Sequence, residues 1–193
     1  ITNNNTFTAG SGIYTFDTNP QALTGTLSIP SVTVTGVTLT NNNTLTVGTA
    51  LSGSGTFTQA NGSTLNIGGT ATVSTLNASV NSNLVNYNGA AQGVNPGTYY
   101  NLTCSGSGAK ANAGTITANG ALTVTAVTFT NNGTVTAATS LTGTGTFTQG
   151  ANSTLNLGGT ATVNTFTATA NPNLVNYTGV SQAINAGSYY NLT

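Results

Sequence analysis

Few side chains in this sequence could carry acid–base or nucleophilic chemistry. The 193 residues include one Lys, one Asp and no His, Glu or Arg, which leaves Asp17, Lys110, Cys104 and seven tyrosines as candidates. General acid–base catalysis needs two groups whose pKa values are tuned against each other. Asp17 and Lys110 lie 93 positions apart, and we interpret them as unrelated surface groups. We therefore predict that the protein is not an enzyme.

The same scarcity excludes several kinds of binding site. Zinc and iron sites need clustered His, Cys or carboxylate ligands, and nucleic-acid surfaces need a basic patch. One Cys, one Asp and one Lys supply neither. The apolar runs are a few residues long, far short of the roughly 20 residues of a membrane span. We expect no metal, no cofactor, no nucleic-acid partner and no membrane span.

Cys104 is the single cysteine, so the chain has no internal disulfide. Lys110 is the only basic neighbour that could lower the pKa of its thiol. We interpret Cys104 as a small buried hydrophobic residue.

Threonine and asparagine take the place of charge, with 43 Thr, 28 Asn and 15 Ser. Thr favours strands because it is branched at Cβ. Asn and Gly favour turns because both tolerate left-handed backbone conformations. The strong helix formers Glu, Arg and Met are absent. The composition predicts an all-β protein with almost no helix.

A tandem repeat of 90 residues organises the chain. Residues 37–103 align without a gap to 127–193, with 42 identities in 67 positions. We divide the chain into unit 1 (1–103) and unit 2 (104–193). Unit 1 has a 13-residue excess near its N-terminus, which we interpret as an added half-turn or a longer loop.

A shorter phrase recurs within the units, as NNNTFTA (3–9), NNNTLTV (41–47) and NNGTVTA (131–137). Each places an Asn or Gly turn before a strand in which apolar residues alternate with Thr. These sub-repeats favour a parallel β-helix, or β-solenoid, in which Thr and Asn side chains form ladders between turns. The alternative is two tandem immunoglobulin-like β-sandwich modules with strand exchange, since 90 residues approaches the size of such a domain.

Residues 83–124 resemble a repeat of large secreted or cell-surface bacterial β-helical proteins of the adhesin or autotransporter type. The resemblance implies an extracellular structural or adhesive role, and it carries over no catalytic residue. The matching positions are Val85, Tyr87, Gly89, Gln92, 100–103, Gly106, Gly108, Gly120, Leu122 and Val124, and in unit 2 Val175, Tyr177, Gly179, Gln182 and 190–193.

Three surface roles are open from the sequence. Glycans on Asn or Thr would give solubility to a surface almost without charge. The Thr-x-Thr phrases lead to the hypothesis of ice binding, although their irregular spacing predicts that they fall on several faces. A carbohydrate-binding surface is the hypothesis for the adjacent tyrosines Tyr99–Tyr100 and Tyr189–Tyr190. We expect one ring of each pair to lie in the core, because neighbouring residues of a strand point to opposite sides. The candidate N-glycosylation sites are Asn4, Asn42, Asn61, Asn77, Asn101, Asn132, Asn152, Asn176 and Asn191.

The sequence thus predicts a structural subunit of an extracellular filament or pilus-like fibre. Copies of the chain would be the partners, joined head to tail by β-strand pairing. The alternative is an adhesin or stalk module that binds carbohydrate, a surface or ice. Since almost nothing titrates, we expect assembly to be insensitive to salt and to pH between about 4 and 9.

Overall fold

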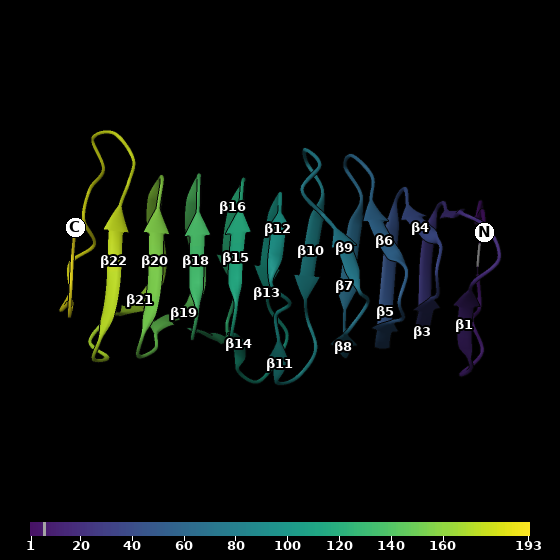
Figure 1. Cartoon of the computed structure of the whole chain (residues 1–193), viewed down its shortest axis with the longest axis horizontal. Helices are drawn as coiled ribbons and strands as arrows, with labels where there is room; N and C mark the ends of the chain where they lie inside the picture. The colour runs from purple at the N-terminus through teal and green to yellow at the C-terminus, as the bar shows by residue number, and fades with distance from the viewer. Residues whose placement is uncertain (6) are drawn as a thin grey trace.

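The structure, a computed structural model, describes residues 1–5 and 7–193. These residues form parallel strands and no helix, and they wind into about nine turns of a β-solenoid with the termini at opposite ends of its long axis (Figure 1). The predicted solenoid is confirmed, and the β-sandwich alternative is wrong because every strand pairing is parallel. The strands are β1 (Ile13–Phe16), β2 (Gln21–Leu23), β3 (Thr26–Val34), β4 (Thr38–Asn41), β5 (Thr44–Ser52), β6 (Thr56–Gln59), β7 (Thr64–Ile67), β8 (Thr70–Ala71), β9 (Thr75–Asn77), β10 (Leu84–Tyr87), β11 (Gln92–Gly93), β12 (Gly97–Tyr99), β13 (Asn101–Cys104), β14 (Lys110–Asn112), β15 (Thr115–Ala118), β16 (Ala121–Val124), β17 (Thr128–Asn131), β18 (Thr134–Ala137), β19 (Ser140–Gln149), β20 (Ser153–Leu157), β21 (Thr160–Thr167) and β22 (Asn173–Tyr177).

Each turn passes through three faces, which we number in the order in which the chain visits them. Face I runs through β7, β10, β13 and β16. Face II contains β1, β8, β11, β14 and β17. Face III runs from Thr2 through β2, β4, β6, β9, β12, β15, β18, β20 and β22 to Leu192. Strands β3, β5, β19 and β21 bend from face I into face II.

Alternating side chains build the core as vertical columns. In β5, Leu45 and Val47 are fully buried, while Thr44 and Thr46 between them are half-buried on the outside. The parallel register places each inward residue above its counterpart in the next turn, so the apolar side chains are buried in columns. One column is aromatic, with the rings of Phe129, Phe147 and Phe166 stacked at centroid distances of 5.5 and 5.8 Å. The central column of face I is Leu27, Leu45, Leu65, Val85, Leu102, Leu122 and Leu141.

Polar ladders reinforce the columns, as the composition predicts. On the outside of face I, Asn86 Nδ2 donates to Asn66 Oδ1 at 3.3 Å, and Asn66 Nδ2 donates to Thr46 Oγ1 at 3.3 Å. Inside a corner, buried Asn41 donates to Gln59 Oε1 at 2.7 Å and to the Thr64 carbonyl at 2.9 Å. The buried Asn41 amide is thereby satisfied by contacts to the following turns, which helps to fix the register of the stack.

The sequence repeat is not a whole number of turns. Strand β4 lies on face III, but its equivalent in unit 2, β17, lies on face II. Likewise β7 lies on face I and its equivalent β20 on face III. Ninety residues therefore span four turns and two faces of a fifth, and unit 2 is rotated by one face relative to unit 1.

The 13-residue excess of unit 1 contains strand β3. In unit 1, β3 lies between Thr24 and β4, and it contributes two faces of one turn. In unit 2, only residues 125–127 lie between β16 and β17, and they contain no strand. The excess therefore adds two faces of one turn, where the sequence left an added half-turn or a longer loop open. The unit boundary itself falls within β13, between Thr103 and Cys104.

Candidate functional site

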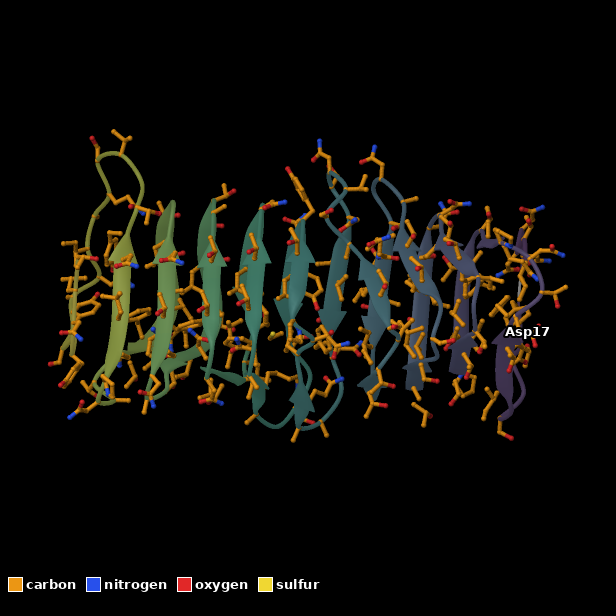
Figure 2. The ribbon with its side chains drawn as sticks, viewed as in Figure 1. Asp17 is labelled. Atoms are coloured by element: carbon orange, nitrogen blue, oxygen red, sulfur yellow. The ribbon has the colours of Figure 1, made fainter. Side chains whose placement is uncertain are left out.

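The two charged side chains lie in very different environments. Asp17 follows β1 and is exposed in the outermost turn at the N-terminal end (Figure 2). Lys110 begins β14 in the middle of the solenoid and is fully buried. The interpretation of Lys110 as a surface group is therefore wrong. Its alternation with Ala111 turns it inward, on the same side of the strand as buried Asn112.

Main-chain carbonyls hold the buried Lys110 ammonium. Nζ donates to the carbonyl oxygens of Gly89 at 2.9 Å, Ala90 at 2.5 Å and Ser107 at 2.8 Å. Desolvation lowers the pKa of this amine, and the nearby Cys104 thiol opposes that shift. Because the carbonyls surround all three N–H groups, this lysine serves to tie two loops together.

A pair of tyrosines fixes the loop after β10. The hydroxyls of Tyr87 and Tyr99 lie 3.3 Å apart, Tyr99 donates to the Asn95 carbonyl at 2.7 Å, and the Asn95 amide donates to Tyr87 at 3.2 Å. Unit 2 repeats the arrangement with Tyr177, Tyr189 and Asn185. As predicted for the first adjacent pair, Tyr99 is buried while Tyr100 is partly exposed.

The side chain of a glutamine in the same loop makes hydrogen bonds to main-chain groups of the turn beneath, where β8 and β11 are not paired. Gln92 Oε1 accepts from the Gly89 amide at 2.8 Å, and Gln92 Nε2 donates to the carbonyls of Ile67 at 2.9 Å and Gly69 at 2.6 Å. Tyr87, Gly89 and Gln92, which are matching positions of the resemblance, thus belong to one structural unit. Their hydrogen bonds hold the loop after β10 against the turn beneath it. Sequence reasoning recognised this motif but did not show what its residues contact.

The loop leaves a groove on face II between β8 and β11, which do not pair with each other. Its volume is about 610 Å³, and a smaller groove of 390 Å³ occupies the equivalent place in unit 2. The lining of the larger groove, in unit 1, includes Gly69, Thr70, Val94, Pro96 and Asn112, so only neutral groups face this groove. Among the described residues, buried Asn112 has a side-chain oxygen without a hydrogen-bond partner.

Cys104 is a free thiol buried in the core of face I, as predicted. Burial raises the pKa of this thiol to about 12, with Lys110 opposing the shift. The thiolate form is therefore negligible at neutral pH, and the residue acts as packing material. No group of three or more His, Cys, Asp or Glu side chains that could hold a metal occurs in the described chain.

We predict that stability is flat between about pH 5 and 8 and falls above pH 9. Burial raises the pKa values of Cys104, Tyr87 and Tyr99, so these groups ionise first in the unfolded chain. The unfolded state then binds fewer protons than the folded state, and stability decreases as pH rises. The lowered pKa of Lys110 acts in the opposite direction, but as a single group.

Urea unfolding followed by circular dichroism should show a loss of about 2 kcal/mol by pH 10.5. A Cys104→Ala variant should lose less over the same range, because it lacks the group that titrates first. A free energy of unfolding that rises above pH 9 would contradict the prediction.

The candidate glycosylation sites differ in accessibility. Seven of the nine asparagines are exposed in the described chain, whereas Asn101 and Asn176 are half-buried. Asn101 Oδ1 accepts from the Ala121 amide at 3.0 Å, and Asn176 Nδ2 donates to Asn156 Oδ1 at 2.8 Å. Both of these side chains take part in hydrogen bonds between turns, which makes them less accessible to a glycan than the other seven. The Thr-x-Thr phrases fall on all three faces, as their spacing predicts.

The outermost turns carry most of the exposed apolar surface. Seven large apolar side chains are exposed in the described chain, and six of them lie in the first or last turn. Two of them have counterparts inside the solenoid that are covered: Ile184 is 57% exposed and its equivalent Val94 is 3%, while Leu192 is 39% exposed and its equivalent Leu102 is 0%. The end-turn residues are Ile1, Ile13, Val180, Ile184, Tyr190 and Leu192, and the seventh is Val80.

The comparisons with known proteins give no relative. No protein-family model, no curated protein and no solved structure matches the chain. Within the described residues, no helix is long and apolar enough to cross a membrane.

Proposed function

We propose that the protein is a structural subunit of an extracellular filament, in which copies associate head to tail by pairing strands at their ends. The observation that carries the proposal is the concentration of exposed apolar side chains in the two end turns. A protein surface rarely gathers apolar residues where nothing covers them, unless a partner does. Here the partner is a second copy, because what covers the equivalent surface inside the chain is another turn of the same solenoid.

Open strand edges support the same proposal. In β1, the outermost strand of face II, the Phe16 carbonyl accepts a hydrogen bond from the Thr35 amide of the next turn. The main-chain groups of Thr15 therefore point the other way, toward the edge of β1 that no strand covers. At the other end, the Val175 amide donates to the Asn191 carbonyl and the Thr193 amide donates to the Val175 carbonyl. The main-chain amide and carbonyl of Leu192 therefore point toward the uncovered edge. The two edges belong to opposite ends of a parallel stack, so their contact is heterologous and does not close, which generates a fibre.

Proline at each open edge should block assembly from one end only. Thr15→Pro and Leu192→Pro each remove an outward amide and no internal hydrogen bond. We expect fibres of uniform width from the wild type in negative-stain images, and no fibres from either variant alone. An equimolar mixture should yield dimers by sedimentation, because each variant keeps the end that the other lacks.

Val80→Pro is the matched control, since Val80 is 44% exposed on a loop between the ends and should leave fibres intact. A wild type that remains a single 19.0 kDa species would overturn the proposal. Dimers of either variant alone would show that like ends associate, which also contradicts head-to-tail assembly.

The groove between β8 and β11 favours a second candidate function, a stalk module that binds a neutral ligand such as a saccharide. Its lining holds only neutral groups, which suits an uncharged ligand. The two functions are compatible, because the groove lies on the side of the solenoid and the pairing edges lie at its ends.

A further inference from the structure

We propose that face III binds ice through an array of threonines that stack in register on its outer surface. The inference goes beyond the filament function, and it rests on strands inside the solenoid. Every outward side chain of the face III strands from β4 to β20 is Thr or Asn. This threonine array comprises Thr38, Thr40, Thr56, Thr58, Thr75, Asn77, Thr98, Thr115, Thr117, Thr134, Thr136, Thr154 and Asn156.

Strand pairing arranges the array in two columns that run along the solenoid. In β15, β18 and β20 the first outward residues, Thr115, Thr134 and Thr154, lie opposite one another, and the second outward residues form a column beside them. The same two columns occur in β4, β6 and β9. The two blocks connect where Ala78 bridges to Tyr99. Figure 1 shows β15, β18, β20 and β22 as an evenly spaced row of parallel arrows.

The uneven spacing of the Thr-x-Thr phrases in the sequence does not disturb these columns. The first outward threonines of β4 and β6 are 18 residues apart (38 to 56), whereas those of β18 and β20 are 20 apart (134 to 154). Corners of different length absorb the difference, so the strands still stack in register. Face I lacks such an array, because Leu84 and Ala121 occupy outward positions there.

The hydroxyl groups of the array are available to water. Among the described residues, a single side-chain hydrogen bond reaches a threonine of the array, from Asn156 Nδ2 to Thr136 Oγ1 at 3.2 Å. On face I, by contrast, Asn66 and Asn86 bond from turn to turn. Threonine is branched at Cβ and has few rotamers, so its hydroxyl and methyl groups repeat along each column at little entropic cost.

The spacing of the array suits an ordered layer of water. Adjacent strands lie about 4.8 Å apart, and alternate residues of a strand lie about 6.6 Å apart. The repeat distances of water molecules on the faces of an ice crystal are close to these two values. Each hydroxyl can hold a water molecule, while the methyl group beside it excludes one. No charged side chain lies among the outward residues, so no hydrated ion interrupts the layer.

Inhibition of ice recrystallisation tests the proposal, and the wild type should keep ice grains small at micromolar concentration. Thr117→Lys places a long charged side chain near the centre of face III. This variant should need at least about tenfold more protein for the same effect, because the flat contact is lost. Thr123→Lys is the matched control and should keep wild-type activity, since Thr123 is an outward, half-buried threonine on face I.

Circular dichroism checks that both variants fold, and Thr58→Lys on β6 repeats the test if Thr117→Lys does not. Grain growth unchanged by the wild type would overturn the proposal, as would equal losses in the face I and face III variants. Wild-type binding to microcrystalline cellulose without an effect on ice would assign the array to a polysaccharide instead. A wild type that is active on ice as a single 19.0 kDa species would keep this inference and contradict the filament.

Discussion

Gly69→Ala is expected to lower the thermal unfolding midpoint by about 10 °C, which corresponds to a loss of about 3–5 kcal/mol. Gly69 lies where the chain turns from face I into β8. A Cβ at this position would lie 1.8 Å from the Thr49 carbonyl oxygen of the turn beneath it. The obstructing atom is main chain in a stacked turn, so neither side can move without breaking the ladder between β5 and β8.

Gly93→Ala is the matched control, because a Cβ there would meet nothing within 4 Å and the φ angle is ordinary. It should change the free energy of unfolding by less than about 1 kcal/mol. Differential scanning calorimetry of the two variants and the wild type makes the comparison. Equal midpoints for both variants would show that the turns at this corner are not in close contact.

Lys110→Met should destabilise the protein by about 2 kcal/mol. The substitution keeps the length of the side chain but removes the ammonium that joins Ala90, Ser107 and Gly89. The Ala90 and Ser107 carbonyls would then lose a charged donor, and hydrogen bonds to charged groups contribute about 1.5–3 kcal/mol each. Relief of the desolvated charge offsets part of this cost.

Urea unfolding at pH 7 measures the difference, and Asp17→Asn is the control. Asp17 is the other charged side chain but is exposed, so its removal should change stability by less than about 0.5 kcal/mol. A Lys110→Met variant more stable than the wild type would mean that the desolvation cost of the ammonium exceeds the value of its three hydrogen bonds.

Local patterns were sufficient to predict the columns of the core. Phrases such as TLTV and TFTQ alternate apolar and polar residues, and the register of their strands follows from that alternation because a slip of one residue would bury Thr and expose Leu. Lys110 could not be predicted in this way. Its strand, KAN, has no large apolar residue to mark the inward side, and only contacts with two distant loops satisfy its charge.

The sequence by itself determined the all-β class, the favoured solenoid and the 90-residue repeat, since these follow from composition and period. The tertiary structure decided how the repeat maps onto turns. Paired strands are separated by 17 residues at Leu84 and Asn101 but by 20 at Thr44 and Thr64. The length of a turn depends on how tightly each corner can stack on the one below, which is a contact between residues far apart in sequence. Only in three dimensions, therefore, does the excess of unit 1 become strand β3, which returns the two ends of the chain to one face.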